Sequence, residues 1–218
     1  MILSEPRFLP AGDSAILIEF ADEIDDATND RVHALAQFLR AQRRADILDL
    51  VPAYSSLLVC YDSRQTDFAL VRDYLAASLS LSQSHIAPES RVIDIPVQYG
   101  GPFGPDLGFI ARWSGLPESQ VVDLHASVLY RVYFVGFTPG FAYLGSVPEK
   151  IAAPRLDTPR ARVPSGSVGI AGRQTGVYPA ETPGGWRLVG RTDLKLFDAN
   201  HQPPTLLRSG DRVRFVPC

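Results

Sequence analysis

Two apolar stripes with helical spacing stand out in the first ninety residues. Their positions are Val32, Leu35 and Leu39 in the first stripe, and Phe68, Val71, Leu75 and Leu79 in the second. The first follows an acidic run at residues 22–26, which suits the positive end of a helix, and it predicts a helix that ends near residue 43. Thr66 or Asp67 precedes the second stripe and is expected to cap that helix.

Strand-like segments surround these two helices. Residues 8–20, 47–51, 54–61 and 91–97 are rich in β-branched and aromatic residues or alternate between apolar and polar. The order strand, helix, two strands, helix, strand predicts a ferredoxin-like α+β unit, although the last strand is also a candidate to open a second domain. Because residues 80–90 are polar and include a proline, we expect a linker there and two domains, 1–90 and 91–218.

The second half of the chain has a different pattern. Gly and Pro recur every few residues over 136–192, which excludes a helix of any length and favours short strands joined by tight turns in a closed or nearly closed β structure. Helices are expected over 104–115 and 117–127. Strands are expected over 128–137 and 210–216, and the second should close the sheet.

Composition narrows the classes of function. The 218 residues are 45% hydrophobic and 21% charged with a net charge of −3, which argues against a general nucleic-acid or membrane-surface binder. No signal peptide or membrane-spanning run is visible, and two lone cysteines, Cys60 and Cys218, fit a reducing cytosol, so a cytoplasmic location is expected. The four histidines are scattered, and we predict no metal site.

Basic residues gather in one part of this acidic chain. Residues 129–198 hold nine Lys/Arg against five Asp/Glu, whereas the rest holds twelve against nineteen. A basic surface with hydroxyls and close-approach glycines suits an anionic ligand or an acidic partner. The glycines and arginines would equally serve as turns and solvated surface of an ordinary β domain.

Familiar catalytic motifs are missing from the sequence. There is no P-loop, no dinucleotide-binding glycine motif and no nucleophile elbow. The catalytic candidates are His125, Arg160 and Arg191. The candidates for substrate binding are Arg155, Ser165, Ser167, Gln174, Thr175, Tyr178, Trp186, Phe137, Phe141 and Tyr143. Each has a structural alternative: aromatic core positions, arginine stems packed on rings, serines bonded to the backbone and a satisfied histidine.

Several long motifs resemble one family. They are Ile95-Pro96-Val97, Tyr99-Gly100-Gly101, Gly104-Pro105-Asp106-Leu107, Leu124-His125, Gly136-Phe137-x-Pro139-Gly140-Phe141-x-Tyr143-Leu144, Val163-Pro164-x-Gly166-Ser167-Val168 and Pro183-Gly184-Gly185-Trp186. In this order they resemble the PxpB/KipI family, also called allophanate hydrolase subunit 1. Pro102, Ala142 and Asp193 depart from the family pattern and affect only the expected loop geometry.

The resemblance implies a fold and an activity. The implied fold is an α+β N-terminal domain followed by a cyclophilin-like β-barrel. The implied activity is that of a bacterial ATP-dependent 5-oxoprolinase, which opens the lactam of 5-oxo-L-proline to give L-glutamate together with PxpC/KipA-like and PxpA-like subunits. ATP is expected to be bound by, or shared with, these partners, because this chain has no nucleotide motif.

Three other functions stay open at this point. One is a subunit of an allophanate hydrolase, and another is a KipI-like inhibitor that binds a sensor histidine kinase. A prolyl isomerase, suggested by the cyclophilin-like fold, is disfavoured because fold does not carry function and no isomerase residues are evident.

Overall fold

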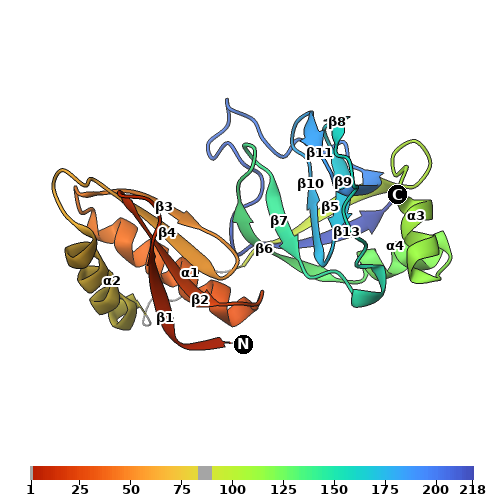
Figure 1. The fold of residues 1–218 in the computed structure, drawn as a ribbon. Helices are drawn as coiled ribbons and strands as arrows, with labels where there is room; N and C mark the ends of the chain where they lie inside the picture. The colour runs from red at the N-terminus through yellow and green to blue at the C-terminus, as the bar shows by residue number, and fades with distance from the viewer. Residues whose placement is uncertain (1, 83–89) are drawn as a thin grey trace. The chain divides into compact units, whose positions relative to one another are not determined.

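The computed structural model describes residues 2–82 and 90–218, which form two compact units, Met1–Glu89 and Ser90–Cys218 (Figure 1). The expected linker lies mostly outside the described residues, since the second helix continues to Ser82 and the description resumes at residue 90. Within the two described ranges, no helix is long and apolar enough to cross a bilayer.

The first unit is a four-stranded antiparallel sheet packed against two helices (Figure 1). The strands are β1 (Ile2–Pro10), β2 (Ala15–Ala21), β3 (Ile47–Pro52) and β4 (Ser56–Tyr61), in the order β1-β2-β4-β3, and the helices are α1 (Asp26–Gln42) and α2 (Phe68–Ser82). Alternate residues of the central strands, such as Ile16, Ile18 and Val59, are fully buried in one core with the helix stripes.

The α+β class is confirmed, but the element order in the first unit differs from the expected one. A single strand was expected over residues 8–20, whereas β1 and β2 form a hairpin around Gly12, which has φ 73°. Pro10 and Gly12 supply the turn, and the Ala11 amide donates to the Ala15 carbonyl at 2.9 Å. The segment expected as a fourth ferredoxin strand or the start of the second domain belongs to the second unit.

Local side chains set the helix ends much as the sequence predicts. Asp25 accepts a hydrogen bond from the Thr28 amide at 2.7 Å and caps α1, and Asp67 accepts one from the Leu70 amide at 3.0 Å at the start of α2. Helix α1 ends at Arg43, which adopts the left-handed conformation with φ 48°.

The second unit is a closed barrel of seven strands in the order β10-β7-β6-β13-β5-β12-β9 (Figure 1). These strands are β5 (Val92–Tyr99), β6 (Leu129–Val135), β7 (Ala142–Gly145), β9 (Ser167–Ala171), β10 (Gln174–Val177), β12 (Arg187–Arg191) and β13 (Arg212–Pro217). All neighbours are antiparallel except the parallel pair β5 and β13. The closed barrel predicted for this part of the chain is therefore confirmed.

Short elements complete the second unit. Helices α3 (Leu107–Ser114) and α4 (Glu118–Ala126) lie between β5 and β6 in the chain, and a single 3-10 turn, η1, spans Glu149–Ile151. A separate two-stranded ribbon pairs β8 (Arg160–Val163) with β11 (Thr182–Gly184).

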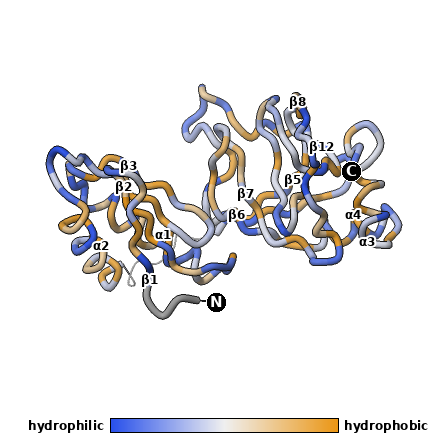
Figure 2. The backbone as a smooth tube through the Cα atoms, viewed as in Figure 1, coloured by the Kyte–Doolittle hydropathy of each residue, from blue (hydrophilic) through white to orange (hydrophobic). Residues whose placement is uncertain are grey.

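The barrel wall has apolar residues on both faces (Figure 2). The interior core includes Val168 and Ile170 of β9, whereas Gly169 between them faces outward against Trp186. A second, smaller core lies on that outer face and consists of Phe141, Val163, Ala171, Tyr178, Trp186 and Leu188.

Candidate anion-binding site

Two glycines facing each other on neighbouring strands form a trough in the outer wall of the barrel. Gly176 of β10 pairs with Tyr143 of β7 on one side and with Gly169 of β9 on the other, and Gly169 pairs with Leu188 of β12. Directly opposed residues project to the same face of a sheet, so the centre of this row lacks side chains.

Phe141 and Trp186 fill the trough. A Cβ atom added to Gly169 would lie 3.0 Å from Cβ of Trp186, and one added to Gly176 would lie 3.1 Å from Cζ of Phe141 and 3.2 Å from Cζ3 of Trp186. These separations are too short for unstrained carbon contacts. The glycines are therefore required by the rings that pack on them.

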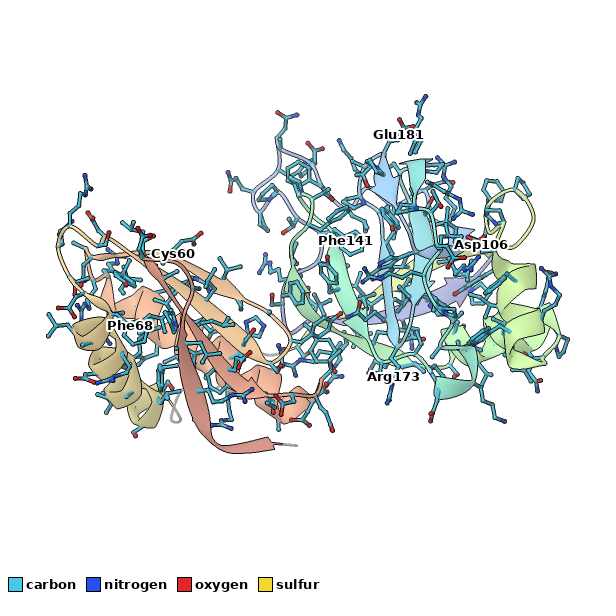
Figure 3. The ribbon with its side chains drawn as sticks, in the orientation of Figure 1. Cys60, Phe68, Asp106, Phe141, Arg173 and Glu181 are labelled. Atoms are coloured by element: carbon cyan, nitrogen blue, oxygen red, sulfur yellow. The ribbon has the colours of Figure 1, made fainter. Side chains whose placement is uncertain are left out.

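The rings belong to an aromatic cluster that we define as Phe141, Tyr143, Tyr178 and Trp186. The Phe141 ring makes edge-to-face contacts with the other three at centroid distances of 4.9 Å, 5.2 Å and 5.4 Å, respectively. Such pairs add stability beyond the area they bury. Because Phe141 (labelled in Figure 3) and Tyr178 are almost fully buried, the cluster is a rigid platform and not an empty cage.

Phe137 projects beside this platform from a strained turn. It has φ 68° and lies between Gly136, whose carbonyl accepts, and Thr138, whose amide donates, a hydrogen bond of 2.8 Å, which defines a γ-turn with positive φ. Its side chain is 63% exposed, and its ring lies 5.6 Å from that of Phe141. A large apolar residue in this conformation costs about 1–3 kcal/mol, which points to a functional reason for its exposure.

Arg155 supplies a positive charge at the platform. Its guanidinium carbon lies 6.0 Å from the centre of the Trp186 ring, and within the described ranges its side chain makes no hydrogen bond or ion pair. Burial raises the pKa values of Tyr143 and Tyr178, and the Arg155 charge opposes that rise. Both phenols are neutral hydrogen-bonding groups near pH 7, so Arg155 is a cation available to an incoming anion.

Arg160, a predicted catalytic residue, has structural partners instead. Its Nη2 donates to Oδ1 of Asp106 at 2.9 Å, while Oδ2 of Asp106 accepts the Leu188 amide at 2.6 Å. The Arg160 side chain is 28% exposed and that of Asp106 is 10% exposed. This network ties the ribbon strand β8 to α3 and β12. The geometry favours a positioning role for Arg160 and does not support a catalytic one.

His125, the second predicted catalytic residue, lies inside the barrel. Thr175 donates its hydroxyl proton to the Gly169 carbonyl at 2.9 Å, so its oxygen accepts from Nε2 of His125, also at 2.9 Å. The Tyr99 hydroxyl then donates to the unprotonated Nδ1 at 2.7 Å. Burial lowers the pKa of His125 to about 3. The ring is neutral, enclosed and fully bonded, which favours a structural role over a catalytic one.

The structure separates the remaining candidates from the aromatic cluster. Thr175 belongs to the His125 network, Ser167 is buried, and the exposed Ser165 donates to the Pro179 carbonyl at 2.9 Å. Gln174 is half-buried at the start of β10. Nε of Arg191, the third predicted catalytic residue, is buried without a hydrogen-bond partner. Roles in substrate binding for these side chains stay predictions.

Two residues that matter in the structure were not among the predicted site residues. Asp106 was expected only at a helix start, yet its carboxylate makes no cap bond to α3 and serves Arg160 and Leu188 instead (labelled in Figure 3). Tyr99 was only part of a motif and is the partner of His125. A buried-polar partner far along the chain leaves no local pattern in a sequence.

The outer-face site is equipped for recognition more than for self-contained catalysis. It offers one free cation, an aromatic platform and neutral phenols, but no paired base and nucleophile among the side chains just described. Over the described parts of the chain, no group of three or more His, Cys, Asp or Glu is placed to hold a metal ion. A carboxylate or phosphate beside a flat apolar body is the ligand that these groups favour.

Comparison with known proteins identifies the family. Residues 6–207 match the family described as "Carboxyltransferase domain, subdomain C and D". The 5-oxoprolinase B subunits of Bacillus subtilis (strain 168) and Escherichia coli O157:H7 are 44% and 46% identical over 215 and 206 residues. The matches cover 94% of this chain in both cases, and 90% and 93% of those proteins.

A solved structure extends the comparison. The crystal structure of TTHA0988 in space group P212121 has a TM-score of 0.82 and 38% identity, covering 95% of this chain but 40% of that one. The chain thus belongs to the carboxyltransferase subdomain C and D family and, within it, to the PxpB/KipI family of 5-oxoprolinase B subunits.

Proposed function

We propose that this chain is a subunit of an ATP-dependent 5-oxoprolinase that opens the lactam of 5-oxo-L-proline to give L-glutamate. The observation that carries the proposal is Arg155, which has no ion pair within the described ranges and lies over the Trp186 ring. A lactam carboxylate would bind the guanidinium while its small ring packs on the aromatic cluster. The names of the 5-oxoprolinase relatives support this substrate.

Partner subunits are part of the proposal. A five-membered lactam is resonance-stabilised and recloses readily, so phosphorylation of its amide oxygen by ATP would make the carbonyl carbon electrophilic. Such a step needs phosphate ligands and a proton acceptor that this site lacks. PxpC/KipA-like and PxpA-like subunits would supply them and bind ATP, and this division fits relatives whose names make them one subunit among several. We also propose a cytoplasmic location, where ATP is available.

TTHA0988 supports the same division of labour. This chain corresponds to about two fifths of that longer polypeptide, 40% by coverage, so a chain of this kind is joined covalently to other segments there. Separate subunits that assemble on this chain would be the equivalent arrangement.

The test is reconstitution with an arginine variant. Glutamate release from 5-oxo-L-proline is expected only when ATP and all three subunits are present. Arg155→Gln should raise KM about 10- to 100-fold, the loss of one charge-assisted contact, without disturbing assembly. Arg162→Gln is the matched control, since Arg162 is exposed and pairs with Glu181 on the same ribbon. No glutamate from a stable complex would refute the proposal.

A second candidate is action on a small linear amide such as allophanate. The family description as a carboxyltransferase domain favours it, because such chemistry centres on carboxylated amides. The same complex assayed with allophanate discriminates the two substrates. Inhibition of a histidine kinase stays an alternative prediction without support from the residues described above.

A further inference from the structure

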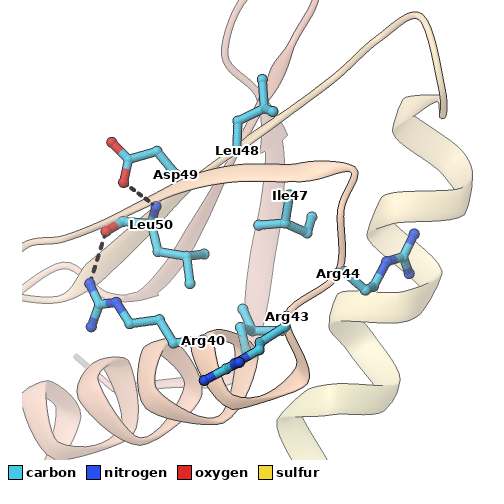
Figure 4. Close-up of a pocket in the computed structure, with 8 residues that line it drawn as sticks. Arg40, Arg43, Arg44, Ile47, Leu48, Asp49 and Leu50 are labelled. Atoms are coloured by element: carbon cyan, nitrogen blue, oxygen red, sulfur yellow. Dashed lines mark hydrogen bonds between the residues drawn. The ribbon is translucent and has the colours of Figure 1, made fainter.

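A small basic pocket lies in the first unit, between the end of α1 and the edge strand β3 (Figure 4). Its volume is about 180 Å³. Three arginines from the last turn of α1 and the loop after it, Arg40, Arg43 and Arg44, line it above an apolar floor of Leu39, Ile47 and Leu50. None of these residues belongs to the aromatic cluster or to the proposed 5-oxoprolinase site.

The three arginines are not equally neutralised. Arg44 forms an ion pair with Asp46, and its guanidinium carbon lies 4.1 Å from the centre of the Tyr74 ring on α2. Arg40 uses one Nη to donate to the Leu50 carbonyl at 3.1 Å, which leaves its other N–H groups available. Arg43 has no hydrogen bond or ion pair anywhere in the described parts of the chain. Positive charge is therefore in excess at the pocket.

Pocket size limits the ligand. Sites for whole metabolites and drugs usually measure about 300–1,000 Å³, and this pocket is smaller. At about 30 Å³ per water molecule it offers the space of roughly six waters. That excludes a nucleotide and admits one charged group on a short chain. The apolar floor favours methylene groups over the fully polar surface of phosphate.

The edge of β3 is closed to strand addition beside the pocket. The outward Leu50 amide donates to Oδ1 of Asp49 at 2.8 Å, and the Leu50 carbonyl accepts from Arg40 (Figure 4). Pro52, at the end of the strand, has no N–H to offer. Side chains that occupy edge groups in this way block pairing with another strand. Recognition here must use the pocket and not the backbone.

We propose that this pocket binds a carboxylate carried on a short aliphatic stem, held by Arg43 and Arg40. Two adjacent guanidinium groups bind a carboxylate through paired, charge-assisted hydrogen bonds, and the stem lies on Leu39 and Ile47. Free small dicarboxylates and the Glu side chains of a protein share this chemistry. The exposed Leu48, at 63%, extends the apolar surface at the rim for whatever carries the carboxylate.

Titration of the full chain with sodium glutarate tests the proposal, followed by NMR shifts of backbone and arginine Nε–H signals. We expect saturable shifts confined to the pocket and none with neutral glutaramide. Arg43→Asn should weaken binding at least tenfold, and asparagine tolerates the left-handed conformation of that position. Arg72→Asn is the matched control, because Arg72 lies on α2 and pairs with the neighbouring Asp73.

A peptide with one Glu between apolar residues identifies the source. Binding more than tenfold tighter than glutarate indicates a protein segment, and equal affinity indicates a free small molecule; both outcomes support the carboxylate site. Arg43→Gly, which favours the same helix end, provides a second well-folded variant. Absence of saturable binding by both probes, or unchanged binding in both Arg43 variants, would overturn the proposal.

Discussion

The inner and outer faces of the barrel wall solve opposite problems with consecutive residues. Thr175 points inward, where Tyr99 and His125 match every donor to an acceptor. Gly176, the next residue, faces outward beneath Phe141 and Trp186. The inner network is complete and holds the wall together, whereas the outer face ends in a cation that nothing in the described ranges neutralises. A ligand would therefore bind to the outer face and not to the interior.

The two tryptophans sharpen this comparison most strongly. Trp186 is 6% exposed in the glycine trough, and Trp113 is 58% exposed on α3. Trp186→Ala should lower the free energy of unfolding by about 3–5 kcal/mol, since it leaves a large cavity over two glycines. Trp113→Ala should change it by about 0.5 kcal/mol or less. Denaturant unfolding measures both, and equal losses would show that the outer cluster is not a core.

The inner network predicts a pH dependence. The pKa of His125 is about 3 when folded and about 6.5 when unfolded, so below pH 6.5 the unfolded chain binds a proton that the folded chain does not. Stability from this residue is present above pH 6.5 and is lost as pH falls toward 3. Between pH 7.5 and 5 the loss should be about 2 kcal/mol.

His125→Gln isolates that term. Unfolding free energies of both proteins between pH 7.5 and 5 are compared by urea denaturation. The variant should lack the His125 contribution to the slope, whatever its stability at neutral pH. Parallel slopes for the two proteins would mean that His125 is accessible to protons, and its catalytic assignment would then regain support.

Local physics explains why much of the fold was predictable from the sequence. The acidic cap at Asp25 and the Gly115 helix end act within a few residues, and the expected helices over 104–115 and 117–127 are confirmed as α3 and α4. Density of Gly and Pro excluded helices over the barrel strands. The β1–β2 turn was missed because residues 8–20 were interpreted as one continuous strand although Pro10 and Gly12 interrupt them.

The site was predicted less well because its roles depend on distant partners. The aromatic residues Phe141, Tyr178 and Trp186 do come together, as their shared motifs suggested. Composition, however, does not distinguish Arg155, which is free of ion pairs in the described ranges, from Arg160, which Asp106 neutralises from 54 residues away. Pairing across the barrel decides which arginine is available to a ligand, and a linear sequence does not display it.

The ribbon strand β8 offers a third and smaller test through two ion pairs. Arg160 pairs with the largely buried Asp106, while Arg162 pairs with Glu181, with side chains 77% and 51% exposed. A double-mutant cycle with Arg160→Gln and Asp106→Asn should give a coupling of about 1–2 kcal/mol. The cycle with Arg162→Gln and Glu181→Gln should give about 0.5 kcal/mol or less. Equal couplings would remove the positioning role assigned to Arg160.

Phe137 makes the smallest expected change in stability and the most informative one. In Phe137→Gly, relief of the positive-φ turn and the greater freedom of the unfolded chain oppose each other, so the free energy of unfolding should shift by about 1 kcal/mol or less. Removal of an exposed ring beside Phe141 should nevertheless weaken substrate binding in the reconstituted complex. Phe103→Gly, at another exposed phenylalanine of the barrel unit, is the control for KM. A variant that keeps the native KM would show that the strain at Phe137 serves something other than the ligand, because a stable protein would then have lost nothing with its most exposed phenylalanine.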